Sequence, residues 1–203
     1  MKKILSLIIC ISVGASVLAQ KEDIKAIKTV YAAYDKAASK HNAEEALRCL
    51  TTSSVECYSK LLGLCKTADS TTLATMPAVD IFMTLTIRAR TDASLLCGMN
   101  TGKDLLLNAL QEGMTGAALP LEAITIQGDT AYATVKSSTV QHRFVKESTG
   151  WKVDLTQTFA ILSQRFEIVT QKLQISKQEL CVATLKQSGI EVPATIWEPT
   201  CKK

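Results

Sequence analysis

Hydrophobic residues recur with the period of an α-helix from Lys21 to Lys40. Charged residues such as Lys25, Lys28 and Lys36 fall between them and are expected to face water. The spacing therefore predicts a helix with one buried face. Its apolar positions are Ile24, Ile27, Tyr31, Tyr34 and Ala38.

Two further helices are predicted in the next part of the chain. Asn42, followed three residues later by Glu45, is a helix-start signal for a short helix that runs to about Leu50. Residues 51–54 carry hydroxyl side chains, which compete for backbone hydrogen bonds and interrupt the helix. A second helix is expected over residues 54–66.

The following segment mixes a loop, an ambiguous run and a clear helix. Residues 67–75 are polar and predict a loop. The apolar run over residues 77–91 fits a helix or a buried strand, and Pro77 at its start favours the helix. A helix is predicted over residues 103–111, and Gly113 can end it in a left-handed conformation.

After Pro120 the hydrophobic period changes to two, which is typical of strands. Gly128 and Gly150 mark turns between short segments. Short connections between consecutive strands predict an antiparallel meander. The predicted strands cover residues 124–127, 130–138, 139–146 and 151–155.

The helical period returns after residue 155, and Ser176 with Glu179 forms a capping box that opens a last helix, which Gly189 can end. Residues 190–203 are expected to form an extended tail. The fold class predicted is α+β, with amino-terminal helices, a four-strand antiparallel meander sheet and carboxy-terminal helices. Residues 20–189 are expected to form a single domain.

The first residues have the order of a secretory signal peptide. Two lysines precede an apolar run from Ile4 to Ile11, and Val17 and Ala19 stand where a signal peptidase prefers small residues. Residues 1–19 are therefore predicted to be removed. The mature protein is expected in the periplasm or outside the cell.

Two other interpretations of residues 1–19, a lipid anchor and a retained transmembrane helix, fit the sequence less well. Lipidation of Cys10 would need a small residue before the cysteine, where Ile9 stands. A retained transmembrane helix would need about 20 apolar residues, and small and polar residues interrupt the run from Ser12 onward. No membrane segment is expected in the mature chain.

The charge of the chain does not point to a nucleic acid. The formal charge of +4 falls to +2 when Lys2 and Lys3 leave with the leader. The remaining basic residues are dispersed among acids and lack interleaved aromatic side chains. No nucleic-acid partner is expected.

Of the 7 cysteines, all except Cys10 lie in the mature chain, and export favours disulfides among them. Zinc is a rival interpretation, but zinc sites usually contain closely spaced cysteines with a nearby histidine. Buried free thiols, which pack as small hydrophobic groups, are the third. The disulfide candidates are Cys49, Cys57, Cys65, Cys97, Cys181 and Cys201.

The sequence restricts the pairing only in part. Cys57 and Cys65 cannot bridge within one helix, because eight residues rise by about 12 Å and a disulfide spans at most about 7 Å between α-carbons. Cys201 is expected to hold the tail. Its favoured partner is Cys181.

The order of helices followed by the segments Ile124–Val135, Phe144–Glu147 and Gly150–Leu155 resembles the nuclear transport factor 2-like superfamily. The resemblance covers about residues 22–157 and implies a curved antiparallel sheet that wraps a long first helix to form a cone. The helices after Leu155 are an extension that the family does not require. Members include isomerases, dehydratases, cyclases and binding or assembly modules, so the resemblance does not fix an activity.

Enzymatic members of such a cone place an Asp, His or Tyr in an apolar pocket, where burial tunes its pKa. His142 alternates with Val140 and Phe144 and is expected to share their inward face. Tyr132 lies on a neighbouring strand, and a His–Tyr pair would suit proton transfer. Tyr34 is a further pocket candidate. A histidine packed in the core is the simpler interpretation of His142.

Other reactive residues have simpler explanations. Asp154 alternates with Trp151 and Val153 and should point away from the face that they bury. His41 is expected in a solvated loop. Apolar neighbours should raise the pKa of Cys97, which argues against a nucleophile. The sequence contains no motif for a cofactor or a metal, and none is predicted.

The sequence therefore predicts an exported, non-enzymatic binding or assembly module. Its ligand would be a small apolar molecule or an envelope protein. The alternative is a pocket enzyme of isomerase, dehydratase or hydrolase type that uses His142 and Tyr132. A third possibility is a structural role through self-association, which an exposed apolar sheet face would indicate.

Overall fold

The computed structural model describes residues 2–112, 120–135 and 141–201, with side chains from Ala19 onward. Contacts divide the chain into two compact units. The first, called the sheet unit, comprises Met1–Thr51 and Gly113–Asp154, and the second, called the helical unit, comprises Thr52–Glu112 and Leu155–Lys203. The expectation of a single domain over residues 20–189 stays a prediction.

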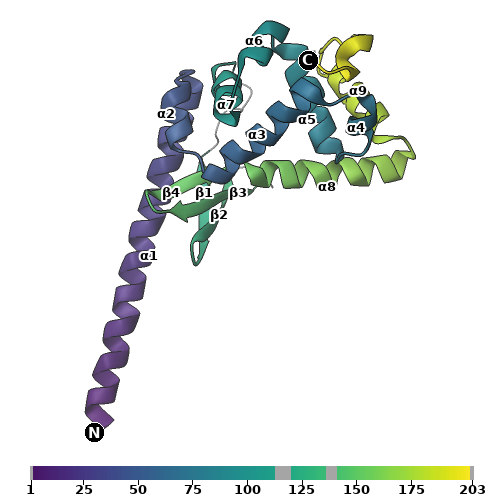
Figure 1. Cartoon of the computed structure of the whole chain (residues 1–203). Coiled ribbons are helices and arrows are strands. Elements are labelled where there is room, and N and C mark those ends of the chain that lie inside the picture. Colours follow the sequence, from purple (N-terminus) through teal and green to yellow (C-terminus); the bar gives the residue numbers. More distant parts are fainter. Residues whose placement is uncertain (1, 113–119, 136–140, 202–203) are drawn as a thin grey trace. The chain divides into compact units, whose positions relative to one another are not determined.

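The sheet unit contains two helices and a four-stranded sheet (Figure 1). Its strands follow each other in the order β1-β2-β3-β4, and each pairs antiparallel with the next. The predicted meander is confirmed. The elements are α1 (Lys2–Ser39), α2 (Ala43–Arg48), β1 (Leu121–Gln127), β2 (Thr130–Val135), β3 (Gln141–Glu147) and β4 (Gly150–Asp154).

One face of this sheet is buried. Ala131 lies opposite Phe144 on β3, and Phe144 lies opposite Val153 on β4. All three are at most 1% exposed. Because alternate residues of a strand share a face, this register also places His142 on the buried face, opposite Ala133.

The helix α1 packs against the sheet, beside β4 and β1 (Figure 1). Ile27, Tyr31 and Tyr34 are buried along one stripe of the helix, as its period predicts. The chain after α2 also joins the sheet, since the Thr51 amide donates to the Val153 carbonyl at 3.0 Å. The buried face of the sheet and the apolar stripe of α1 therefore form the core of this unit.

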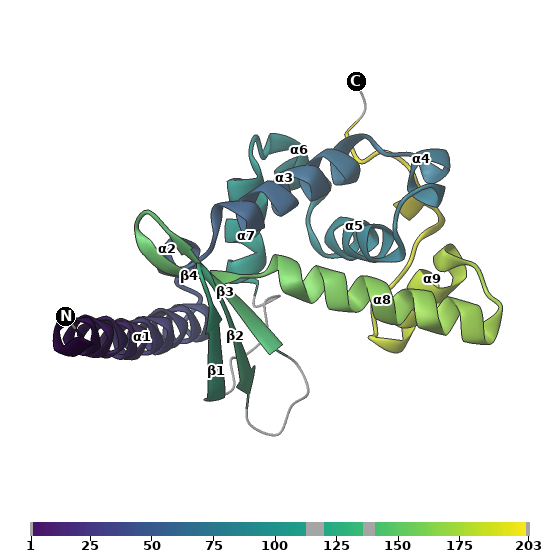
Figure 2. The same ribbon diagram turned by 90° about the horizontal axis from the view of Figure 1, so that it is seen from below.

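The central helix of the helical unit is α5, which contacts α3, α8 and α9 (Figure 2). Residues on all sides of α5 are buried, and this explains why its sequence has no clear apolar face. The apolar run over residues 77–91 forms a helix and not a strand, which confirms the favoured prediction. The elements are α3 (Thr52–Thr67), α4 (Ser70–Ala74), α5 (Ala78–Arg90), α6 (Ala93–Gly98), α7 (Gly102–Gln111), α8 (Thr156–Leu173), α9 (Lys177–Gln187) and the 3₁₀ helix η1 (Ala194–Trp197).

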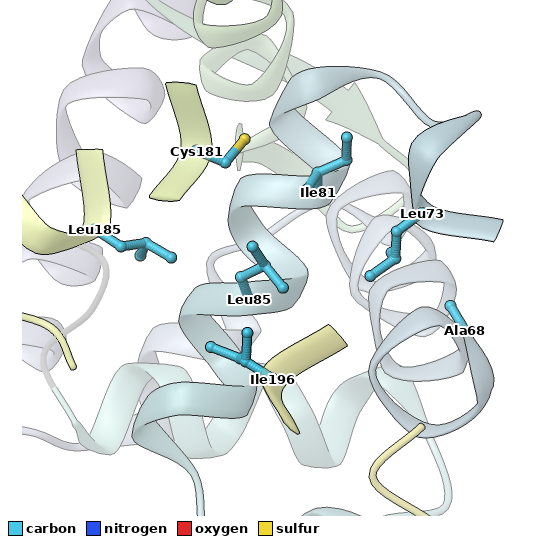
Figure 3. Close-up of a cluster of buried hydrophobic side chains, with 7 residues drawn as sticks. All are labelled: Ala68, Leu73, Ile81, Leu85, Cys181, Leu185 and Ile196. Carbon is cyan, nitrogen blue, oxygen red and sulfur yellow. The ribbon is translucent and has the colours of Figure 1, made fainter. Parts of the chain in front are cut away.

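A hydrophobic cluster joins α5 to the carboxy-terminal segments (Figure 3). Ile81 and Leu85 of α5 pack with Cys181 and Leu185 of α9 and with Ile196 of η1. A second cluster joins α5 to α8, where the Phe82 and Phe166 rings lie 5.3 Å apart. The carboxy-terminal residues are therefore part of the core of this unit.

Two predictions of local structure are wrong, and one helix was not predicted. The expected loop over residues 67–75 contains α4, which begins where the Asp69 carboxylate accepts from the Thr72 amide at 2.7 Å. Residues 93–98 form α6, which the sequence analysis missed and which Asp92 caps in the same way. The tail over residues 190–203 contains η1 instead of being extended throughout. In each helix, a local hydrogen bond or tertiary packing compensates for weak periodicity.

Some predictions fall on residues outside the described ranges. They are the helix end at Gly113, the last part of the 130–138 strand and the inward position of Val140. The predicted helix starts at Asn42 and Ser176 are confirmed by their side-chain bonds. Among the described residues, no helix combines the length and the hydrophobicity that a membrane crossing requires.

Candidate functional site

His142 lies in an aromatic cluster between α1 and the sheet. Its Nε2 is 3.4 Å from the Tyr31 Oη, and the centres of the two rings are 5.2 Å apart. The Tyr31 ring also meets Phe144 edge-on at 5.9 Å. In the tautomer protonated at Nδ1, the imidazole Nε2 accepts a hydrogen bond that the Tyr31 hydroxyl donates. The arrangement is a packed histidine with one polar neighbour that α1 supplies.

Partial burial lowers the pKa of His142, because desolvation disfavours the imidazolium. The ring is therefore held neutral at neutral pH. A neutral imidazole is able to act as a base, but its Nε2 already faces the Tyr31 hydroxyl. The geometry therefore pairs the imidazole with the Tyr31 hydroxyl.

The structure brings together some of the predicted pocket residues and separates others. Phe144 lies in the cluster with His142, and Tyr34 is buried on the same stripe of α1 as Tyr31. Tyr132 lies opposite Arg143 in the ladder, whereas His142 lies opposite Ala133. Since neighbouring residues of a strand point to opposite faces, Tyr132 and His142 lie on different faces of the sheet.

A polar anchor fixes α1 to the β3–β4 hairpin. The Asp23 carboxylate accepts from Lys146 Nζ at 2.8 Å and from Trp151 Nε1 at 2.7 Å. These two donors lower the pKa of Asp23, since both favour the carboxylate. The Lys146 ammonium also lies 5.7 Å from the centre of the Trp151 ring. Asp23 is thus a structural acid.

Asp154 forms a cross-strand pair on the opposite face of the sheet. It lies opposite Arg143, and its Oδ2 is 3.1 Å from the Arg143 Nη1. The residue is 4% exposed. It points away from the face of Trp151 and Val153, as predicted, but it is buried there against an arginine. A carboxylate held in this way is suited to an ion pair and not to proton transfer.

The helical unit contains a disulfide between Cys97 and Cys201. Cys201 does hold the tail, but the expected partner Cys181 is wrong. Cys181 is instead a buried free thiol that donates to the Ala78 carbonyl at 3.3 Å. Its position on α9, inside the cluster of Figure 3, keeps it in the core. No pattern in the sequence indicated α6, so none indicated this partner.

Three more cysteines with described side chains form no disulfide. Cys49 and Cys65 are buried and Cys57 is half-buried. Burial raises the pKa of Cys65 and of Cys181 to about 12 in each case. Such thiols stay protonated at neutral pH and are poor nucleophiles. The expectation that Cys57 and Cys65 do not pair is confirmed.

Two basic side chains bind backbone carbonyls around the disulfide. Arg88 donates to the carbonyls of Leu64, Cys65 and Ala68 near the end of α3 and to that of Ile196 in η1. Lys66 donates to the carbonyls of Cys97 and Met99. The cationic groups suit the negative end of the α3 dipole. The sequence analysis missed this role, because an arginine in a helix carries no signal for its distant partners.

Within the described residues, no group of three or more His, Cys, Asp and Glu side chains is placed to hold a metal ion. Comparison with known proteins found no matching family model, curated protein or solved structure.

Proposed function

We propose that this chain is an exported, non-enzymatic binding or assembly module. The observation that carries the proposal is the Cys97–Cys201 disulfide, because disulfides persist in oxidising compartments and are rare in the cytosol. The signal-peptide pattern of residues 1–19 supports the same location. The proposed ligand is a small apolar molecule or another envelope protein.

The environment of His142 supports binding over catalysis. A general base must reach a substrate proton, whereas His142 Nε2 faces the Tyr31 hydroxyl. The isomerase, dehydratase or hydrolase alternative pairs His142 with Tyr132, and the strand register gives these residues different faces. The buried acid Asp154 is engaged by Arg143. These contacts favour structural roles for the groups that such an enzyme would use.

Membership of the nuclear transport factor 2-like superfamily is part of the proposal. A long first helix packed against a four-strand antiparallel meander supports it. The superfamily includes binding and assembly modules, so this membership agrees with the proposed role.

Cell fractionation with intact-mass measurement tests the proposal. We expect the protein outside the cytoplasm, without residues 1–19 and with a mass that corresponds to one disulfide. A reduced cytoplasmic protein that retains the leader would contradict it. Substrate turnover that His142→Ala abolishes, without a change in the free energy of unfolding, would replace the binding module with the enzyme alternative.

A further inference from the structure

Lysines gather on the side of α1 that faces away from the sheet. About 100° of rotation separates successive residues of a helix, and four lysines fall opposite the stripe that packs on the sheet. All four side chains are exposed. This lysine face consists of Lys21, Lys25, Lys28 and Lys36.

The lysine face carries four positive charges, whereas α1 has three acids from Lys21 onward, which are Glu22, Asp23 and Asp35. Of the acids on α1, Asp23 is engaged by Lys146 and Trp151, and Glu22 is exposed. An open hollow runs along the same side of the helix. Its lining consists of Lys21, Ile24, Lys25, Lys28, Thr29 and Ala32.

We propose that the lysine face binds the anionic headgroups of a phospholipid membrane. Its charge is complementary to such a surface, which attracts clustered lysines. From Lys21 to Lys36 the helix rises by about 22 Å, and the sheet occupies the other side. The lysine face can therefore meet a membrane while Tyr31 and Tyr34, on the opposite side of α1, stay packed against the sheet.

Two observations favour a membrane over an acidic protein. The residues that contribute most to protein interfaces are enriched in Trp, Tyr and Arg, and the hollow is lined by lysines, Thr29, Ala32 and Ile24. In addition, α1 continues without a break from residue 2, and the apolar leader precedes Lys21 directly. The lysine face therefore lies where the chain leaves the membrane during export.

This inference goes beyond the proposed function, because headgroup attraction does not depend on the ligand of the module. Co-sedimentation with phosphatidylcholine vesicles, with and without phosphatidylglycerol, tests it on the protein as the cell processes it. We expect binding only to vesicles that contain phosphatidylglycerol. Salt at about 1 M should abolish it, since screening then acts over about 3 Å.

A triple variant identifies the surface. Lys21→Gln, Lys25→Gln and Lys28→Gln together should weaken binding about 100-fold, at roughly fivefold for each lysine. The matched control removes the same charge from exposed lysines of the helical unit and should change binding less than about threefold. It carries Lys103→Gln, Lys172→Gln and Lys186→Gln.

Three results would overturn the inference. They are no binding to anionic vesicles, equal binding to neutral vesicles, and an equal loss in the two triple variants. Equal binding to neutral vesicles would assign the attachment to a retained leader. Lack of vesicle binding by a protein that is correctly exported would leave the proposed function standing and exclude a membrane as the partner of the lysine face.

Discussion

The Arg88 side chain donates hydrogen bonds to four backbone carbonyls. These carbonyls belong to two segments that lie far apart in the sequence. Burial lowers the pKa of this guanidinium, since desolvation disfavours the charge. Arginine remains protonated at neutral pH even so. The charged side chain therefore connects the end of α3 to η1 through hydrogen bonds.

Arg88→Ala should lower the free energy of unfolding by about 2–4 kcal/mol, because hydrogen bonds from charged groups are the stronger ones. Arg88→Lys should recover only part of this, because lysine lacks the planar fork. Urea unfolding measures both. Arg90→Ala, at an exposed position of the same helix, is the control and should change stability by less than about 0.5 kcal/mol. Equal effects of the two alanine variants would contradict the role of Arg88.

His142 should make the stability of the sheet unit depend on pH. Its pKa is lowered in the folded state, so the unfolded chain binds more protons between the folded pKa and about 6.5. Stability is therefore greatest above pH of about 6.5 and falls as the pH drops through this window. The hydroxyl and the ring of Tyr31 both face the imidazole.

His142→Gln should reduce this loss of stability at acidic pH, although packing lost with the ring lowers stability at pH 8. Unfolding midpoints between pH 5 and 8 measure the difference. The control is His41→Asn at the exposed histidine after α1, because asparagine tolerates its positive φ of 54°. If both variants keep the pH slope of the wild type, His142 is not its source.

At the same scale, the sequence predicted which face His142 occupies but not its partner. Strand alternation alone relates His142 to Phe144. The choice of Tyr31 over other residues of α1 depends on where the helix crosses the sheet, which local spacing does not encode. The separation of Tyr132 from His142 depends on the pairing register in the same way.

Among the elements, the long amphipathic ones were the most predictable. The stripe of α1 and the alternation of β2 are strong because each element buries one face. The helix α5 was ambiguous because it is buried on several sides, and burial of this kind removes the period. The short helices α4 and α6 depend on Asp69 and Asp92 caps and on tertiary contacts instead of on a pattern.

A close approach between α3 and α7 gives a prediction for these elements. A Cβ on Gly102, the first residue of α7, would lie 2.2 Å from the Ser59 amide nitrogen. Gly102→Ala should therefore push the helices apart and lower stability by about 1–3 kcal/mol. Gly63→Ala, inside α3, meets no atom within 4 Å and should raise stability by about 0.5–1 kcal/mol. Thermal unfolding compares the two, and a tolerated Gly102→Ala would contradict the close contact.

On the scale of the whole molecule, the chain enters each unit twice. The helical unit is built from residues 52–112 and from residues after 155, so its core joins segments about a hundred residues apart. Sequence patterns indicate single helices and strands, but they do not indicate which distant segments pack together. For this reason, the fold class was predictable, whereas the pairing of Cys97 with Cys201 was not.

The disulfide should contribute much of the stability of the helical unit. It joins residues 104 apart in the sequence, and closing a loop of that size restricts the unfolded chain by up to about 4–5 kcal/mol. Cys201→Ser should therefore lower the free energy of unfolding by about 2–5 kcal/mol. It should also make the melting temperature insensitive to reductant. Cys57→Ser, at a half-buried free thiol, is the control and should keep the sensitivity of the wild type.

Thiol counting on the denatured, unreduced protein checks the same bridge independently. The free cysteines of the described residues are Cys49, Cys57, Cys65 and Cys181, and Cys10 leaves with the predicted leader. Four reactive thiols are therefore expected in the processed chain, and Cys201→Ser should add one by releasing Cys97. Six thiols in the wild type would exclude the disulfide and remove the observation on which the proposed export rests. A wild-type protein without reactive thiols would contain further bridges among these four cysteines and would contradict their state in the structure.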